Sequence, residues 1–194
     1  MIFDKQKAEA SKKNLQNADL KNADLQEADL SEGILIEACL ENCNLSEADL
    51  CGTDISGANL KNSRLHRTVL YRCRGKEVDF SNAVLTQANL VEANLSGANF
   101  THANLMESNI EGANLINTCF KDANLCEVNL TGVFLANANL SGANFTNSEC
   151  IAADLVGCDL TGANLHNTYL NHADLSGANL KSALNLTCDQ VETA

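Results

Sequence analysis

The chain of 194 residues carries 25 acidic and 13 basic side chains, a formal net charge of −12, and has neither tryptophan nor proline. This acidic balance argues against binding nucleic acid or an anionic membrane through net charge. Because no run of about 18 apolar residues occurs and the start, MIFDKQKAEASKKN, has no apolar stretch of signal-peptide length, we expect a cytoplasmic protein without a membrane span.

Residues 1–13 precede the regular part of the sequence and are predicted to be an N-terminal cap. The segment can form a short amphipathic helix in which Ile2 and Phe3 act as a lid. A cap is expected because the open end of a stacked structure presents unpaired backbone groups.

From residue 14 to residue 184 the sequence repeats every five residues. Of the 34 positions at multiples of five from Leu15 to Leu180, 26 are leucine, four phenylalanine and two isoleucine. A small residue lies two places before each except Leu15, and aspartate or asparagine lies one place before 24 of them, as in ADLKNADLQEADL. A period of five fits neither a helix nor a strand, because either would point the leucines in several directions. Each unit is therefore predicted to be a short extended piece followed by a corner.

The second residue after each leucine position indicates this corner. It is glycine nine times and asparagine nine times, and these residues tolerate a positive φ in turns. Nine of the eleven glycines of the chain lie in this one column, so the corner signal is specific.

The A-[D/N]-L-x-x pattern resembles that of the pentapeptide-repeat family over roughly residues 14–184. The resemblance implies an all-β fold, a right-handed quadrilateral β-helix in which four units close one coil and the leucines and small residues point inward. The solenoid would have about 8 coils, stacked at the spacing between β-strands, with its cohesion coming from neighbouring coils.

Under that four-sided closure, residues 20 apart are stacked neighbours. Phe80, Phe100 and Phe120 then form one inward column, and Leu25 and Leu165 are further core residues. Buried aromatic stacking needs no ligand, so these five side chains are predicted to be structural.

The segment YRCRGKEVDF, residues 71–80, interrupts the pattern because the leucine position at 75 holds glycine. In one interpretation Cys73 and Val78, which are larger than the usual alanine, restore volume whose loss would cost about 2–5 kcal/mol. In the other, residues 71–76 bulge from the coil as an extra unit. The sequence leaves both open.

The same region gathers basic side chains. Residues 61–76 carry six basic residues and no acid, so the remainder of the chain carries −12 − 6 = −18. The members of this basic girdle are Lys61, Arg64, Arg67, Arg72, Arg74 and Lys76. Around a square coil they would suit an acidic partner or self-association with an acidic end. The alternative is a solvated band paired with acids on adjacent coils, which are Glu47, Glu77, Asp79 and Glu92.

No catalytic, cofactor or metal site is expected, and the protein is predicted not to be an enzyme. The nine cysteines include no pair 20 apart and no CxxC, and the four histidines lack the acid and nucleophile neighbours that catalysis requires. The glycines form no phosphate-binding loop. A narrow filled rod also lacks a concave pocket of ligand size.

Three consecutive coils are predicted to place apolar residues on one outward side, where this sequence usually has asparagine, aspartate or serine. These residues are Ile116, Phe134, Ala136 and Val156. A contiguous exposed apolar patch marks a candidate interface; the alternative is a flanking loop or tail that covers it.

Residues 185–194 are predicted to be a C-terminal tail or cap. The end of the chain, ALNLTCDQVETA, offers Leu184, Leu186 and Val191 to cover the last coil.

The sequence favours a non-enzymatic protein-binding or scaffold rod, a monomer or dimer that acts on an unidentified protein partner through its outward side chains. Direct binding to nucleic acid is not expected. The resemblance implies two alternatives: an acidic mimic of duplex DNA that binds DNA gyrase or topoisomerase, as quinolone-resistance members of the family do, or a regulatory module in bacterial differentiation or stress. The spread of charge over four sides and the basic girdle weigh against the DNA mimic.

Overall fold

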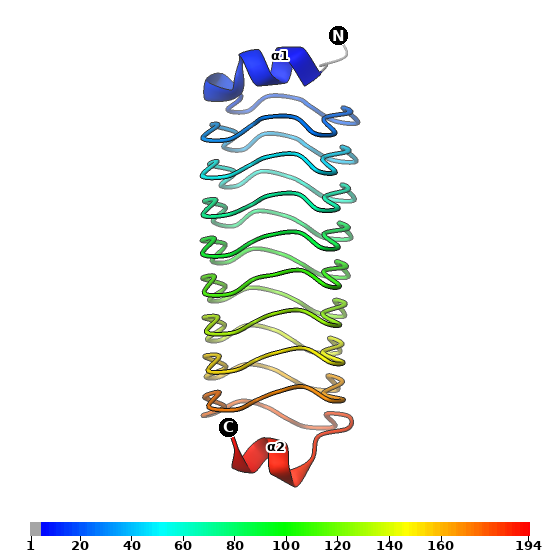
Figure 1. Ribbon diagram of the computed structural model, residues 1–194, viewed down its shortest axis with the longest axis vertical. Coiled ribbons are helices and arrows are strands. Elements are labelled where there is room, and N and C mark those ends of the chain that lie inside the picture. Colours follow the sequence, from blue (N-terminus) through cyan, green and yellow to red (C-terminus); the bar gives the residue numbers. More distant parts are fainter. Residues whose placement is uncertain (1–4) are drawn as a thin grey trace.

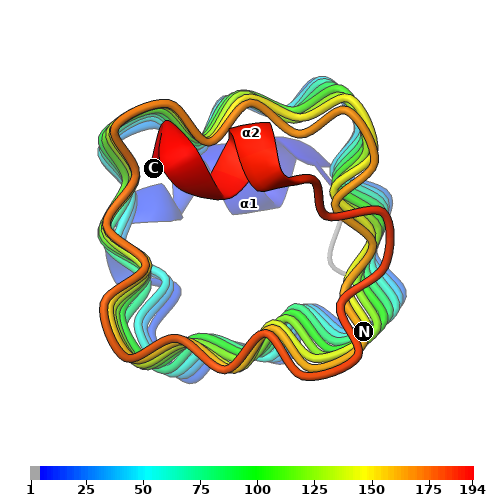
Figure 2. The same ribbon diagram turned by 90° about the horizontal axis from the view of Figure 1, so that it is seen from below.

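Residues 5–194 are described by a computed structural model, in which they form a straight column of stacked coils with a short helix at each end (Figure 1). Seen along its axis, the column is a square with four sides (Figure 2). Within these residues every β-bridge is parallel and joins residues 20 apart, from Asp19↔Cys39 to Asn164↔Leu184. One coil therefore contains 20 residues, or four units, as the resemblance implied.

The two ends carry the helices. α1 (Lys5–Ala10) and the 3-10 helix η1 (Lys12–Asn14) lie at the N-terminal end, and α2 (Cys188–Glu192) lies across the C-terminal end. The predicted lid residues Ile2 and Phe3 lie outside the described residues.

Backbone hydrogen bonds hold each coil to both of its neighbours. Each side is extended for too few residues to form a continuous strand, and in the described part of the chain the β-structure consists of isolated bridges. Leu105 N–H donates to Asn124 O on the next coil at 2.9 Å, and Asn104 N–H donates to Ala83 O on the preceding coil at 2.9 Å. The same pattern recurs in unit after unit, so the buried backbone is paired.

The corners adopt a left-handed backbone whatever residue they hold. All residues in second place after a leucine position, from Asn17 to Ser182, have φ between 53° and 71°. The corner prediction is confirmed, and it extends to residue types that rarely adopt this conformation, such as Arg72 (φ 53°) and Glu107 (φ 60°). The inter-coil bonds on either side hold these residues in place.

The aspartate or asparagine that precedes most leucine positions has a structural role. Its Oδ1 accepts a hydrogen bond from the N–H two residues on, which closes an Asx turn at the start of the corner. Asn99 accepts in this way from Thr101 N–H at 3.0 Å, and its Nδ2 donates to Asp79 Oδ1 at 3.1 Å. One side chain thus fixes a corner and links two coils.

Asn99→Ala is therefore expected to lower the free energy of unfolding by about 1–2 kcal/mol, because these two hydrogen bonds and a third, donated by Thr101 Oγ1 to Asn99 Oδ1, are lost. Urea unfolding followed by circular dichroism measures this change. Val84→Ala is the matched control: Val84 also precedes a leucine, is 37% exposed and closes no Asx turn, so the change should stay within about 0.5 kcal/mol. Equal losses in the two variants would contradict the role of the Asx turn.

The interior of the column is filled by apolar side chains. Leu25, Phe80, Phe100 and Phe120 are 0% exposed and Leu165 is 2% exposed. The ring centroids of Phe80 and Phe100 lie 5.0 Å apart and those of Phe100 and Phe120 lie 4.5 Å apart, with interplanar angles of 13° and 3°. The three rings form a continuous stack in the lumen.

The chain does not bulge at residues 71–76. Arg74 keeps its bridges to Asp54 and Asn94, and Gly75 N–H donates to Asn94 O at 2.8 Å. The count of five residues per side is preserved, so the bulge interpretation is wrong.

Neighbouring side chains fill the volume that a leucine at 75 would occupy. A Cβ added to Gly75 would lie 2.7 Å from Leu95 Cδ2, 3.0 Å from Ile55 Cγ1 and 3.2 Å from Val78 Cγ1. Cys73 and Val78 were the expected sources of this volume; Val78 is among the three nearest side chains and Cys73 is not, while the stacked neighbours Leu95 and Ile55 were not foreseen. The interruption is absorbed inside the column.

Candidate functional site

Four of the six side chains of the basic girdle are paired within the chain. Arg72 Nε lies 2.6 Å from Glu92 Oε2, and Arg74 Nε lies 3.3 Å from Asp54 Oδ2. Each pair joins residues 20 apart on stacked coils. The hydrogen bond and charge of Glu92 raise the pKa of the Arg72 guanidinium.

The other girdle residues divide into paired and unpaired side chains. Arg67 Nε donates to Gln87 Oε1 at 2.8 Å, and Lys76 Nζ lies 3.5 Å from Glu77 Oε1. Within residues 5–194, the side chains of Lys61 and Arg64 have no ion pair or hydrogen bond. Exposed ion pairs contribute little to stability, so the girdle is a weakly stabilising band. Among the described residues, its members Lys61, Arg64 and Arg67 have no acidic partner.

Some of the predicted partners of the girdle differ in the structure. Glu77 and Glu92 pair with it as expected, whereas Glu47 and Asp79 form no ion pair with it. Long side chains choose among several acceptors on adjacent coils, and this choice is not encoded in the repeat.

The predicted apolar residues lie on one side of three stacked coils. The Phe134 side chain is 49% exposed, and the other three are partly buried. α1 and α2 lie at the two ends of the column and not along its sides (Figure 1), so neither helix covers this surface. We call it the Phe134 patch: Ile116, Phe134, Ala136 and Val156.

On the coils above and below Phe134, the residue in the same position closes an Asx turn. Asn114 Oδ1 accepts from Ile116 N–H at 3.2 Å, and Asp154 Oδ1 accepts from Val156 N–H at 3.1 Å. Phe134 has no acceptor, so here a local hydrogen bond is given up and a phenyl ring is exposed. A local rule that is broken without a structural gain points to a functional position.

The lack of an Asx residue before a leucine position also identifies exposed residues that the sequence reasoning missed. Ten residues before leucine positions are neither aspartate nor asparagine. Among them, Ile34, Val84 and Tyr169 are 36%, 37% and 57% exposed. The signal was present in the sequence, since each departs from the Asx column.

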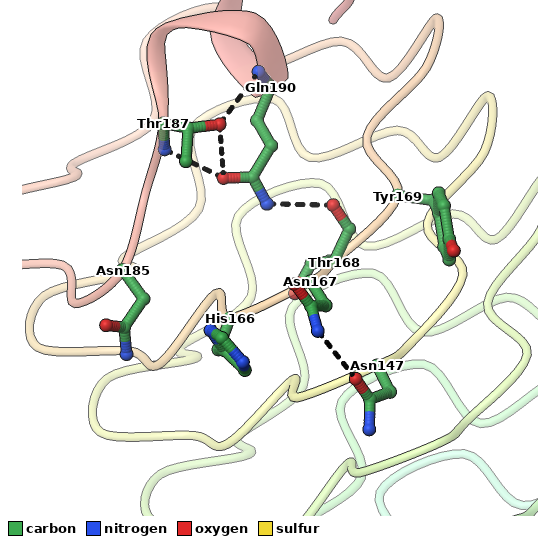
Figure 3. Close-up of a pocket in the computed structure, with 8 residues that line it drawn as sticks. All are labelled: Asn147, His166, Asn167, Thr168, Tyr169, Asn185, Thr187 and Gln190. Atoms are coloured by element: carbon green, nitrogen blue, oxygen red, sulfur yellow. Dashed lines mark hydrogen bonds between the residues drawn. The ribbon is translucent and has the colours of Figure 1, made fainter.

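An open groove of about 740 Å³ lies beside α2 at the C-terminal end (Figure 3). Gln190 Nε2 donates to Leu165 O at 2.9 Å and to Thr168 O at 2.8 Å, and a capping box with Thr187 begins the helix. The lining consists of amide, hydroxyl and aromatic side chains without a carboxylate, lysine or arginine: Asn147, His166, Asn167, Thr168, Tyr169, Asn185, Thr187 and Gln190. Sequence reasoning missed this groove because it depends on where α2 docks.

The buried thiols are poor nucleophiles and poor metal ligands. Burial raises the pKa of Cys73 and Cys150 to about 12 and that of Cys43 and Cys158 to about 11. These thiols therefore stay protonated near neutral pH. In residues 5–194, no three histidine, cysteine, aspartate or glutamate side chains lie together as a metal site.

No helix in the described part of the chain has both the length and the apolar character needed to cross a membrane.

A family model described as pentapeptide repeats, with eight copies, matches most of the chain. The matched residues are 11–46, 34–70, 76–112, 108–147 and 148–184. The residues skipped between the second and third matches, 71–75, end at the glycine at position 75. No curated protein matches the chain.

Solved structures of pentapeptide repeat proteins are also similar to the chain. HetL, involved in heterocyst differentiation regulation in the cyanobacterium Nostoc sp. strain PCC 7120, is 32% identical; the match covers 87% of this chain and 81% of HetL, with a TM-score of 0.45. A protein from the Arabidopsis thaliana thylakoid lumen is 25% identical over 72% of each chain, with a TM-score of 0.30. QnrB1, a plasmid-mediated fluoroquinolone resistance protein, is 24% identical over 86% of this chain and 85% of its own, with a TM-score of 0.38.

Proposed function

Because the chain belongs to the pentapeptide-repeat family, we propose that it is a non-enzymatic rod, a right-handed quadrilateral β-helix that binds a protein partner through its outward side chains. The filled lumen supports this, since it leaves recognition to the surface. One observation carries the proposal: Phe134 exposes 49% of an aromatic side chain at a position where 24 of the 34 units have an Asx residue.

The Phe134 patch suits the centre of an interface. Aromatic side chains are enriched among the residues that contribute most to binding, and charged residues are depleted there. The patch contains no charged side chain, and the adjacent Asp154 is engaged with the Val156 N–H. Asp154 is the stacked neighbour of Phe134 and forms no ion pair within the described residues. A partner that packs on Phe134 therefore has to offer this carboxylate a cationic or hydrogen-bonding group.

The charge around the patch favours a basic partner. Residues 77–180 hold eleven carboxylates and one lysine, a net charge of 1 − 11 = −10. A complementary potential accelerates association and weakens with added salt. The basic girdle contributes less, because three of its six members form ion pairs within the chain, although the unpaired Arg64 remains available for a second contact.

Mimicry of duplex DNA has less support. The carboxylates are distributed around the column, since Glu149, Asp154 and Asp159 lie on three successive sides. They do not follow one side as a phosphate backbone would. A DNA gyrase supercoiling assay is therefore expected to show neither inhibition nor protection by this protein.

Phe134→Ser is expected to reduce the partner captured from an extract of the source cells by at least about tenfold, because truncating a central aromatic contact commonly costs 2 kcal/mol or more. Immobilised wild-type and variant proteins are compared by quantitative mass spectrometry. Val84→Ser is the matched control, since Val84 lies in the equivalent column on another side. Undiminished capture by a folded Phe134→Ser protein would refute the proposal.

A further inference from the structure

The two ends of the column are covered unequally. At the N-terminal end, Ala8 of α1 is fully buried, and Leu15 and Leu25 are 1% and 0% exposed. At the C-terminal end, α2 has no buried residue, Val191 is 48% exposed, and the inward Leu175 and Leu180 are only partly buried. The last coil therefore keeps an incompletely covered edge.

α2 and the residues around it provide hydrogen-bond partners for only part of this edge. Gln190 Nε2 donates to Thr168 O at 2.8 Å, and His172 N–H donates to Thr193 O at 2.6 Å. These bonds involve residues 165–172, whereas Val191 and Ala194 face residues 173–176 and Leu180 across an open cavity of about 360 Å³. Seen along the axis, α2 lies over one half of the square and leaves the other half uncovered (Figure 2).

Two consecutive sides of the last coil, residues 173–183, retain unpaired backbone groups. In the described part of the chain, the N–H groups of Leu175 and Leu180 and the carbonyls of Ala173 and Ala178 have no hydrogen-bond partner. The two leucine side chains are only partly buried, unlike those of the preceding coils. Such an edge is a template for another extended chain.

The equivalent backbone groups one coil earlier show which hydrogen bonds an added coil would form with this edge. Leu155 N–H donates to Asp174 O at 2.9 Å, and Asp174 N–H donates to Ala153 O at 2.9 Å. A single residue on the added coil thus accepts from the leucine and donates to the small residue below it. The free edge at residues 173–183 presents this donor and acceptor pair twice, five residues apart.

We propose that this C-terminal edge is a docking site for an extended segment of a partner protein, which adds in parallel as two further units. This is recognition by β-strand addition, in which backbone bonds give affinity and inward side chains give specificity. For each of the two sides that it covers, the segment needs a small residue and, two places later, an aliphatic residue. These two residues point inward, onto the partly buried side chains of Leu175 and Leu180.

The structure also indicates which residue should stand between the small and the aliphatic residue, where the side chain points outward. Aspartates in this column accept from an asparagine 20 residues on: Asn179 Nδ2 donates to Asp159 Oδ1 at 3.2 Å and Asn99 Nδ2 donates to Asp79 Oδ1 at 3.1 Å. Asp174 lacks such a donor from a following coil. The segment therefore has asparagine over Asp174, which gives the motif small–Asn–Leu, two corner residues, small–Asn–Leu.

A second copy of this chain does not supply this segment. The first coil of such a copy carries ADLKNADL at residues 18–25, and within the described residues the N–H groups of Asp19 and Asp24 have no partner. Stacking that coil here would place the Asp19 carboxylate over Asp174, where the site favours an asparagine, and α1 lies over the same end (Figure 1). A tail-to-tail contact would bring Asp174, Asp189 and Glu192 against the same three acids, which is repulsive. A segment with basic corner residues is complementary to them.

The test uses the full chain and a fluorescein-labelled peptide, Ala-Asn-Leu-Lys-Gly-Ala-Asn-Leu-Lys, as the probe. We expect saturable binding by fluorescence anisotropy and at least tenfold slower hydrogen exchange of the Leu175 and Leu180 amides, with no change at Leu105. The same peptide N-methylated at both asparagines cannot donate to Ala173 and Ala178, and should lose binding.

Other outcomes would overturn the inference. A scrambled peptide of the same composition that bound equally would show charge attraction alone. Exchange protection at other residues, or a dimer of the free protein with Leu175 and Leu180 already protected, would place something else at the edge. Phe134→Ser should bind the peptide as the wild type does. A failure of the peptide to bind the wild type would therefore not bear on the proposed role of the Phe134 patch.

Discussion

Phe100→Ala is expected to lower the free energy of unfolding by about 3–5 kcal/mol. Phe100 is fully buried and stacks on both Phe80 and Phe120, at centroid distances of 5.0 Å and 4.5 Å. The cavity left behind cannot close, because backbone bonds fix the spacing of the coils and the interior is tightly packed. Guanidinium unfolding monitored by circular dichroism measures the loss.

Phe134→Ala is the matched control because it removes the same atoms from a side chain that is 49% exposed. We expect a change below about 1 kcal/mol. Comparable destabilisation by the two substitutions would mean that the aromatic stack is not a core element, or that Phe134 is not free at the surface.

Gly75→Leu is expected to destabilise the column by about 1–3 kcal/mol, although it restores the repeat consensus. The reason is overpacking, since the added Cβ alone would lie 2.7 Å from Leu95 Cδ2 and 3.2 Å from Val78 Cγ1. Denaturant unfolding again provides the measurement. A stabilised variant would show that the site is an unfilled cavity.

The double variant Gly75→Leu/Val78→Ala tests the compensation directly. Its destabilisation is expected to fall short of the sum of the two single changes by about 0.5–3 kcal/mol, the range seen for residues in contact. Strict additivity would show that Val78 does not occupy the space left by the missing leucine.

The period of the fold could be predicted from the sequence because the leucine, Asx and corner columns each repeat every five residues. The number of units per coil could not, since a period of five fits any number of sides, and four came from the family resemblance. The cause of the Asx column was also hidden: only the structure shows Asn99 Oδ1 accepting from Thr101 N–H.

The candidate site was predictable where it depends on the repeat and unpredictable where it depends on docking. The positions of Ile116, Phe134, Ala136 and Val156 follow from the count of 20 residues per coil. The open edge beside α2 does not follow, because it arises from where a short helix packs after the repeat ends.

The most direct test of the proposed interface replaces Phe134 with a photo-crosslinking phenylalanine analogue in the source cells. We predict a covalent adduct to a basic protein at position 134 and none when the analogue replaces Val84, which occupies the same position of the repeat on another side. No adduct at 134, or equal adducts at both positions, would contradict the account that this protein recognises its partner through the Phe134 patch.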